Sequence, residues 1–320
     1  MIKILANDGI DDAGKKLLTD VGFEVSTSKL SPEELLKNLS EFDALLVRSA
    51  TKVTQQVIDS APNLRLIGRA GVGLDNIDVE YAKYKNIRIA NTPNASSQSV
   101  AELVFAHMFN MSRFLYMSNR EMPVSGLDNF AGLKKKYSEG IELRGKKLGI
   151  IGFGRIGQAT AKIALGLGME ILPFELYADE VKIEIDFLKT SNSSSIYLTM
   201  KCVSFEELLH NSDFITLHVP FPKGAPPVLG KKEIAMMKKG VCLVNTARGG
   251  VLNEDDLLEG LNSGQVACAA LDVFAGEPKP RKELLEHPHI SLSPHIGAST
   301  KEAQERIGIE LAQQVIDFFK

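Results

Sequence analysis

Residues 148–157 read LGIIGFGRIG, an apolar run that passes directly into a G-x-G-x-x-G motif. The apolar run predicts a buried strand, and a helical pattern follows the last glycine. In this setting the first glycine permits a tight turn, the second lets the backbone approach a pyrophosphate, and the third lets the helix pack against the strand. The N–H groups of the first helical turn favour a phosphate. The residues expected to form this dinucleotide site are Gly152, Gly154, Arg155, Ile156 and Gly157.

An acidic residue supports the same interpretation. A second apolar strand, residues 170–174, ends in Glu175. The acid that binds the ribose hydroxyls of a dinucleotide is expected about 20 residues beyond the glycine motif, and Glu175 has this spacing. The alternative is a glycine-rich turn that binds no ligand, but strand, helix and acid together favour the dinucleotide.

Length and composition indicate a globular protein of about two domains. The chain has 320 residues, of which 44% are hydrophobic, and a formal net charge of −3. This charge implies neither a nucleic-acid partner nor a membrane surface. The three cysteines have no C-x-x-C spacing, so reduced thiols and no metal site are expected. No apolar run is long enough for a signal peptide or a membrane span, and the chain is expected to be cytoplasmic.

Strand and helix patterns alternate along most of the chain. Repeated β-α units predict an α/β protein whose parallel sheets carry helices on both faces. We expect two doubly wound domains: a flavodoxin-like domain for the substrate, formed by residues 1–93 and 291–320, and a Rossmann domain for the dinucleotide, formed by residues 94–290. The last helix, residues 301–319, is expected to dock on the first domain. Its apolar face consists of Ile307, Leu311, Val315 and Phe318.

Two segments of the second domain depart from this alternation. A long helix is predicted over residues 100–117, followed by an irregular arm over residues 119–145. Such an arm can wrap a partner subunit, although its cluster of lysines at 134–136 is also typical of a solvated face. Residues 177–203 predict a surface hairpin with a loose tip at residues 191–195.

Two arginines follow predicted strands of the first domain. Arg48 comes directly after the strand 43–47, and Arg69 follows the strand 64–67. Because ligands of parallel sheets bind beyond the carboxyl ends of strands, two guanidinium groups there suit a carboxylate or a phosphate. For an isolated pair, surface arginines in weak salt bridges are the simpler explanation.

Three polar residues lie at or near strand ends in the second domain. Arg248 follows the strand 241–245, Glu277 follows the strand that ends near Asp272, and His295 lies in the sequence SPHIG. A histidine can take the proton of an alcohol, and a carboxylate beside it fixes the ring and stabilises its protonated form. A guanidinium can hold a substrate carboxylate. The trio therefore suits hydride transfer to a nicotinamide, although His after Pro and Glu before Pro are also ordinary turn residues.

The chain resembles the D-2-hydroxyacid dehydrogenase family along almost its whole length. The shared motifs are GFGRIG at 152–157, NTARGG at 245–250, ALDVF at 270–274 with Glu277-Pro278, and Pro294-His295. The resemblance implies an NAD-dependent enzyme whose catalytic residues are Arg248, Glu277 and His295. It also implies further cofactor contacts at His218, Pro220, Ala247 and Asp272.

Within the family, the phosphoglycerate dehydrogenases are most similar in the first domain. The motifs are VRSATKVT at 47–54, GRAGVGLDNID at 68–78 and GAST at 297–300. They imply NAD-dependent oxidation of 3-phospho-D-glycerate, the first step of serine biosynthesis, in a homodimer formed through residues 96–145. The implied substrate residues are Arg48, Ser49, Arg69, Gly71, Val72 and Gly73, with the two arginines on the phosphate. Alternatives are a glyoxylate or hydroxypyruvate reductase, and a dinucleotide-sensing corepressor-type scaffold.

The sequence departs from the family pattern at four places. Glu175 stands where Asp is usual, but either acid binds ribose hydroxyls and repels a 2′-phosphate, so NAD is expected over NADP. Residues 221–227, FPKGAPP, are less polar than usual, and residues 177–203 are longer. The sequence ends at Lys320, where longer members continue into a serine-sensing domain, so regulation through such a domain is not expected.

Overall fold

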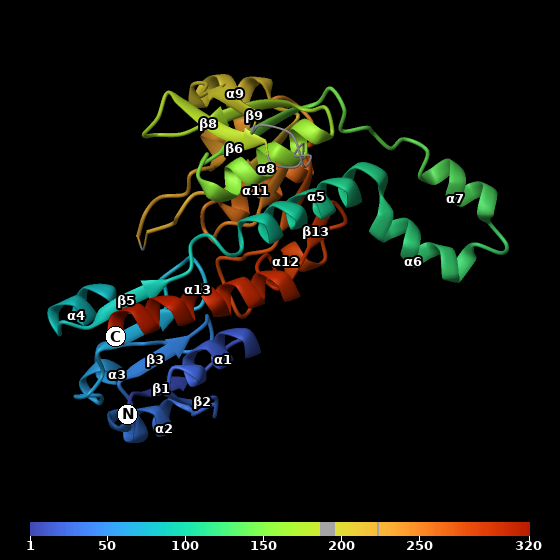
Figure 1. Cartoon of the computed structure of the whole chain (residues 1–320). Helices are drawn as coiled ribbons and strands as arrows, with labels where there is room; N and C mark the ends of the chain where they lie inside the picture. Colours follow the sequence, from blue (N-terminus) through green and yellow to red (C-terminus); the bar gives the residue numbers. More distant parts are fainter. Residues whose placement is uncertain (186–195, 223) are drawn as a thin grey trace. The chain divides into compact units, whose positions relative to one another are not determined.

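The computed structural model describes residues 1–185, 196–222 and 224–320 (Figure 1). The chain divides into two compact units, one formed by Met1–Ser99 with Ala298–Lys320 and the other by Val100–Gly297. The divisions lie slightly beyond the predicted boundaries at 93 and 290. The first division falls inside helix α5 (Ser97–Arg113), whose opening turn stays with the first unit.

The first unit contains a parallel five-stranded sheet in the order β2-β1-β3-β4-β5. This is the flavodoxin-like strand order. Its central strands β3 and β4 are buried except for Arg69 at the end of β4, as expected for parallel strands that helices cover on both faces. The strands are β1 (Lys3–Ala6), β2 (Glu24–Ser26), β3 (Ala44–Val47), β4 (Leu66–Arg69) and β5 (Arg88–Asn91).

Helices of the first unit begin at side-chain caps. The capping residues are Asp11, Ser31, Thr54, Asp78 and Thr300. The helices are α1 (Asp12–Asp20), α2 (Pro32–Asn38), α3 (Gln55–Asp59), α4 (Val79–Tyr84) and α13 (Lys301–Phe319), with a 3-10 turn η1 (Leu39–Glu41).

Helix α13 packs into the first unit, where Figure 1 shows it in red. A Cβ atom on Gly14 of α1 would lie 2.4 Å from the carbonyl oxygen of Gly308, so the two helices approach as closely as glycines allow. Three of the four predicted docking residues are buried, namely Ile307, Leu311 and Val315. The prediction was wrong for Phe318, which is 38% exposed because the ring of its neighbour Phe319 turns inward against Phe23.

The second unit contains a parallel six-stranded sheet in the order β13-β12-β11-β10-β6-β7. Successive residues of its central strands enter two different apolar cores, so both faces are covered. The edge strand β13 was not predicted, because three residues carry too little pattern. The strands are β6 (Lys147–Ile151), β7 (Glu170–Phe174), β10 (Phe214–Leu217), β11 (Val241–Asn245), β12 (Val266–Leu271) and β13 (Ile290–Leu292).

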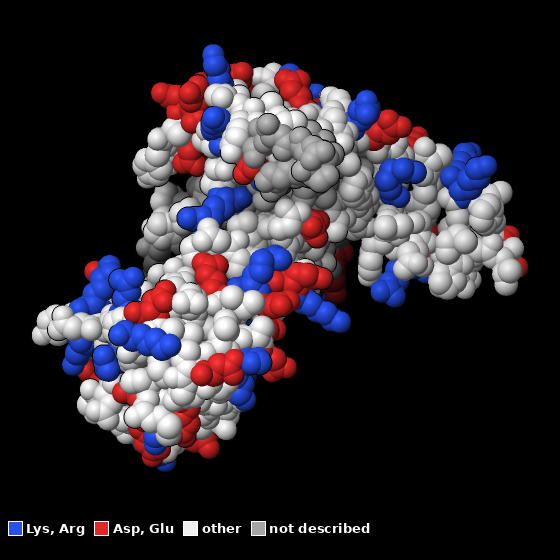
Figure 2. Space-filling view, in the orientation of Figure 1, with Lys and Arg blue, Asp and Glu red and all other residues white. Residues whose placement is uncertain are grey.

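Five of the described helices of the second unit lie between these strands in the sequence, which completes the predicted α/β alternation. They are α8 (Arg155–Gly166), α9 (Phe205–Asn211), α10 (Lys231–Met236), α11 (Glu254–Ser263) and α12 (Lys282–Leu285), in addition to α5. None of the helices in the described ranges is both long and apolar enough to cross a membrane. On the face shown in Figure 2, basic and acidic side chains are interspersed, in keeping with the small net charge.

The predicted irregular arm is wrong, because helices α6 (Leu115–Ser125) and α7 (Phe130–Lys136) occupy most of it. The predicted helix over 100–117 is also too long. Phe114 adopts a left-handed conformation with φ of 53°, which ends α5 and starts α6 in a new direction. The apolar stripe continues across this break, so periodicity alone could not locate it.

The predicted hairpin is present as strands β8 (Glu180–Ile185) and β9 (Ile196–Lys201), paired antiparallel. Ile183 and Ile185 of β8 are buried in one of the cores of the second unit, so the hairpin is attached by apolar packing. Its predicted loose tip at residues 191–195 lies outside the described residues.

Candidate active site

The glycine motif forms a tight turn between β6 and α8. Gly152 has a φ of 91°, and a Cβ atom there would lie 2.6 Å from the carbonyl oxygen of His218. A Cβ atom on Gly157 would lie 2.3 Å from the carbonyl oxygen of Gly152. These two glycines are therefore required by backbone conformation and close packing.

The beginning of α8 fits a phosphate. Gly154 is the N-cap residue and provides no side-chain hydrogen bond to the helix. A Cβ atom on Gly154 would meet no atom within 4 Å, so the space beside the first helical turn is open. The N–H groups that begin with Arg155 and Ile156 have the arrangement that binds the pyrophosphate of a dinucleotide.

Glu175 lies directly at this glycine turn. Its Oε2 accepts a hydrogen bond from the backbone N–H of Phe153 at 2.9 Å, and its Oε1 accepts one from Leu176 at 3.0 Å. The carboxylate at the end of β7 is thus fixed beside the phosphate-binding turn, where a ribose-binding acid belongs. Its contact with ribose stays a prediction.

Arg248 is presented by a rigid turn after β11. The buried side chain of Asn245 closes this turn, accepting from the N–H of Ala247 at 3.1 Å and donating to the carbonyl of Arg248 at 2.9 Å. The Arg248 guanidinium donates to the Ala247 carbonyl at 2.7 Å. A Cβ atom on Gly249 would lie 2.0 Å from the carbonyl oxygen of Phe274, so this turn packs directly on the turn that carries Glu277.

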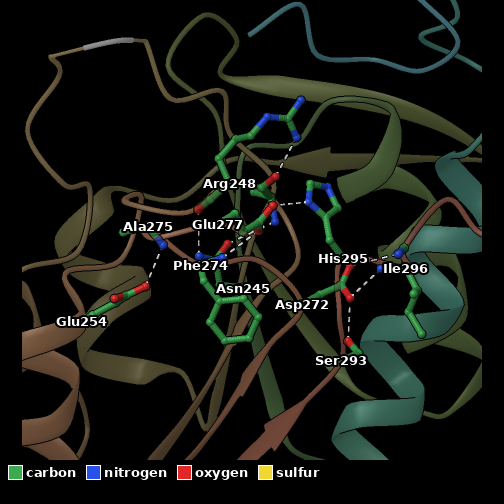
Figure 3. A network of polar contacts seen from close by, with 12 residues as sticks. Asn245, Arg248, Glu254, Asp272, Phe274, Ala275, Glu277, Ser293, His295 and Ile296 are labelled. Atoms are coloured by element: carbon green, nitrogen blue, oxygen red, sulfur yellow. Dashed lines mark hydrogen bonds and ion pairs between the residues drawn. The ribbon is translucent and has the colours of Figure 1, made fainter. Parts of the chain in front are cut away.

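Glu277 and His295 form an ion pair or hydrogen bond, in keeping with their predicted positions at one edge of the second sheet. Glu277 Oε2 lies 2.8 Å from His295 Nδ1, and the other carboxylate oxygen accepts from the N–H of Phe274 at 2.9 Å. The side chains are 35% and 44% exposed, so the pair can reach a ligand. In Figure 3 the side chains of Arg248 and His295 both extend toward the top of the view. A largely apolar cavity of about 390 Å³ adjoins the pair.

Asp272 anchors the turn that carries His295. Its buried carboxylate accepts from the Ser293 hydroxyl at 2.6 Å, from the N–H of Ile296 at 2.9 Å and from the N–H of Gly297 at 2.9 Å. The N–H of His295 donates to the Asp272 carbonyl at 2.8 Å, and His295 has a φ of 55°. This network holds His295 in an unfavourable left-handed conformation (Figure 3). The predicted cofactor contact of Asp272 stays a prediction.

His218 lies inside the unit as a neutral ring. Its Nε2 is 3.1 Å from the Thr216 hydroxyl and 3.4 Å from the Thr160 hydroxyl of α8, and its Nδ1 is buried with no partner among the described residues. Burial lowers the pKa of His218 to about 3. The predicted cofactor contacts of His218, exposed Pro220 and buried Ala247 stay predictions.

The predicted substrate residues of the first unit lie after two neighbouring strands. Val47 pairs with Arg69 across β3 and β4, so Arg48 and Arg69 lie at one edge of the sheet. Ser49 and Val72 are exposed there, and Gly71 and Gly73 belong to the loop after β4. The arginines are half-buried, which distinguishes them from fully solvated surface side chains.

Asp8 and Asn76 hold the loop of Arg48, a role that the sequence interpretation missed. Asp8 Oδ2 accepts from the N–H of Arg48 at 2.8 Å and from the N–H of Thr51 at 3.0 Å. The Asn76 amide donates to the carbonyls of Arg48 at 2.8 Å and Thr51 at 2.7 Å. The position of Asp8 just after β1, beside β3, was the available signal.

The guanidinium of Arg69 folds back over its own loop. It donates to the Ala70 carbonyl at 3.0 Å. A Cβ atom on Gly71 would lie 1.4 Å from Nη1 of Arg69, so only glycine leaves room for this conformation. The glycine at 71 therefore leaves room for the arginine, and its predicted contact with the substrate stays a prediction.

Comparisons with known proteins agree with this geometry. Residues 105–297 match the family described as D-isomer specific 2-hydroxyacid dehydrogenase, NAD binding domain. The chain is 42% identical over 317 residues to a hydroxypyruvate reductase of Thermotoga maritima, with 98% of this chain and 97% of that protein covered. It is also 42% identical over 316 residues to a D-3-phosphoglycerate dehydrogenase of Methanocaldococcus jannaschii, with 98% of this chain but 57% of that protein covered.

A solved structure of an NAD⁺-bound 3-phosphoglycerate dehydrogenase from Entamoeba histolytica is similar, with a TM-score of 0.76 and 26% identity, covering 99% of this chain and 95% of that one. The chain thus spans nearly the full length of some relatives and little more than half of others. The glycine turn, the paired Glu277 and His295, and the sequence likeness lead to one conclusion. This chain belongs to the D-isomer specific 2-hydroxyacid dehydrogenase family, and its second unit contains the NAD-binding domain of that family.

Proposed function

We propose that this chain oxidises 3-phospho-D-glycerate to 3-phosphooxypyruvate with NAD, the entry reaction of serine biosynthesis. The observation that carries the proposal is the pair of arginines at the ends of β3 and β4, Arg48 and Arg69. A phosphate dianion is bound best by guanidinium groups, whereas an unphosphorylated hydroxy acid has no second anionic group for these two cations.

In the proposed reaction, His295 takes the proton of the C2 hydroxyl. Because Nδ1 of His295 faces Glu277, Nε2 is the atom available to accept that proton. The carboxylate of Glu277 orients the ring and stabilises the imidazolium that forms. Arg248 holds the substrate carboxylate, and bound NAD supplies the nicotinamide that accepts the hydride from C2.

Hydroxypyruvate reduction is the second candidate. The relative that bears this name is matched over 97% of its length, whereas the phosphoglycerate dehydrogenase from Methanocaldococcus jannaschii is matched over 57%. The two reactions share the hydride chemistry and differ in the phosphate. The arginines of the first unit are therefore the reason that we favour the phosphorylated substrate.

A substrate panel tests the proposal. NADH or NADPH absorbance is followed, using 3-phosphoglycerate and glycerate with NAD or NADP in one direction, and hydroxypyruvate and glyoxylate with NADH or NADPH in the other. We expect the highest kcat/KM with 3-phosphoglycerate and NAD. A higher kcat/KM with hydroxypyruvate than with 3-phosphoglycerate would favour the second candidate.

We also propose that the chain forms a homodimer through α6 and α7. No residue of α6 is buried, and the apolar side chains Leu115, Val124, Leu127 and Phe130 are 62%, 84%, 100% and 59% exposed. Apolar side chains gathered in this way are typical of an interface with another protein. A second copy is the partner that is always present at equal concentration.

Light scattering after gel filtration tests the dimer. Wild type is expected at twice the chain mass of 35.0 kDa. Leu127→Glu is expected to shift the protein toward the monomer, whereas Tyr84→Glu, at a 76% exposed position of the first unit, is the control that leaves the mass unchanged. A monomeric wild type at micromolar concentration would contradict the proposal.

A further inference from the structure

A buried histidine of α5 is connected to the turn of His295. His107 is only 6% exposed, and its ring lies between two serines of the segment that includes β13. Nδ1 of His107 is 2.8 Å from the Ser291 hydroxyl, and Nε2 is 2.9 Å from the Ser293 hydroxyl. The Ser293 hydroxyl also contacts the carboxylate of Asp272, which anchors the turn.

The hydrogen bonds of Ser293 determine whether Nε2 of His107 carries a proton. The Asp272 carboxylate already accepts two backbone N–H groups and can only accept, so the Ser293 hydroxyl must donate to it. Ser293 has a single hydroxyl proton. It must therefore accept from His107, which places a proton on Nε2.

The hydrogen bonds on the Nδ1 side of His107 indicate the same tautomer. The Asn110 side-chain oxygen accepts from the N–H of Tyr116 at 2.7 Å, so its amide nitrogen is the atom 2.8 Å from the Ser291 hydroxyl. Ser291 accepts from that amide and donates its own proton to Nδ1 of His107. Each hydrogen bond in the chain from Asn110 to Asp272 then has one donor and one acceptor.

A neutral ring is the form that this arrangement requires. Burial lowers the pKa of His107, against an opposing contribution from Asp272 that raises it. Protonation would place a second N–H against Ser291, which would then have two donors and no acceptor for its own proton. The ring therefore acts as a fixed relay of hydrogen bonds rather than as an acid or a base.

We propose that His107 is a positioning residue for His295, in which the neutral Nε2–H tautomer orients the Ser293 hydroxyl toward Asp272 and so fixes the turn 295–297. The catalytic part of this inference rests on the proposed function. The turn needs such support because His295 has a positive φ, a conformation that a non-glycine residue adopts only when its surroundings impose it. A loosened turn misplaces the imidazole relative to the reacting hydroxyl.

Three variants separate hydrogen bonding from packing. His107→Phe keeps an aromatic ring and removes both bonds, His107→Gln can keep a donor for Ser293, and Met108→Leu is the packing control at the next, fully buried position of α5. We expect His107→Phe to lower kcat about tenfold, with the KM for NAD within twofold of wild type. His107→Gln is expected to restore most of the rate. Equal losses in the Phe and Gln variants, or a raised KM at constant kcat, would overturn the proposal.

Amide hydrogen exchange of Ile296 and Gly297 in the ligand-free protein gives a readout that does not depend on the reaction. We expect faster exchange in His107→Phe and unchanged exchange in Met108→Leu. If His107→Phe does not fold, Ser293→Ala breaks the same link with a smaller change of volume and is expected to have the same effect. Unchanged exchange in the folded variant overturns the positioning role, whereas a wild type inactive on every 2-hydroxy acid overturns the proposed function.

Discussion

The two units hold their candidate functional residues in different ways. In the second unit the candidate catalytic side chains themselves are fixed: Glu277 binds His295 directly, and Asp272 holds the backbone of the turn. In the first unit Asp8 fixes the backbone of the Arg48 loop, and the Arg48 guanidinium has no partner among the described residues. One unit therefore fixes an imidazole through its own hydrogen bond, and the other fixes the backbone that carries a guanidinium group.

This difference suits two different tasks. A proton transfer requires the base within hydrogen-bond reach of one atom, so small displacements cost rate. Attraction between a guanidinium and a phosphate varies more gently with distance, and a flexible side chain can adjust to the ligand. We expect variants of the second unit to lower kcat on every substrate, and variants of the first unit to change which substrate is accepted.

The largest effect is expected for His295→Asn. Asparagine can still donate to Glu277 but cannot take up a proton, so kcat should fall about a thousandfold with phosphorylated and unphosphorylated acids alike. Stopped assays give kcat, and NADH fluorescence gives a cofactor Kd that should stay within twofold. Near-normal turnover would remove His295 from the mechanism.

Arg69→Ala is expected to act selectively. Loss of a charge-assisted contact to phosphate should lower kcat/KM for 3-phosphoglycerate about a hundredfold and leave an unphosphorylated 2-hydroxy acid unaffected. Arg65→Ala is the control, because Arg65 lies just before the start of the same strand and stacks on Phe319. Equal losses on both substrates would contradict a phosphate role and the division of tasks between the units.

Asp8→Ala is expected to have a smaller effect of the same kind. It removes the acceptor for two backbone N–H groups and one hydroxyl, so the Arg48 loop loses its fixed conformation. The KM for 3-phosphoglycerate should rise about tenfold at nearly constant kcat, because the chemical groups are untouched. Asp12→Ala, at an exposed position of α1, should change neither constant. A fall in kcat with constant KM is the result that would argue against this role.

The last prediction concerns stability rather than activity, because it follows from pH, and it again separates the units. All 6 histidines lie between Val100 and Gly297, in the second unit. Because burial lowers the pKa of His218 to about 3, the unfolded chain binds a proton that the folded unit refuses as the pH falls below about 6.5. Stability is therefore present at neutral pH and lost on acidification, by about 2 kcal/mol between pH 7 and pH 5 for this residue.

Hydrogen exchange at pH 7 and pH 5 can locate this loss. Opening of β10 and α8, which contact His218, should become easier at pH 5, whereas the sheet of the first unit should be unaffected. His218→Gln should reduce the difference between the two pH values. A loss of the same size in the variant would assign the effect to other groups.

The sequence by itself determined the architecture and the location of most candidate residues. Alternating β-α patterns predicted two parallel sheets, and the glycine motif predicted the turn between β6 and α8. Glu277 and His295 could be predicted to lie close together because parallel strands end at a common edge of the sheet. These features can be predicted from the sequence because each depends on a local pattern of residues or on a rule that holds for every parallel sheet.

Only the tertiary structure decided how those residues are supported. Asp8 is separated from Thr51 by 43 positions and His107 from Ser291 by 184, and no periodicity links residues so far apart. The break at Phe114 was hidden for a related reason, because the apolar stripe continues while the backbone turns. Hydrogen bonds between distant segments require donor–acceptor distances that are correct to within a few tenths of an ångström. Such distances are established only when the cores have packed.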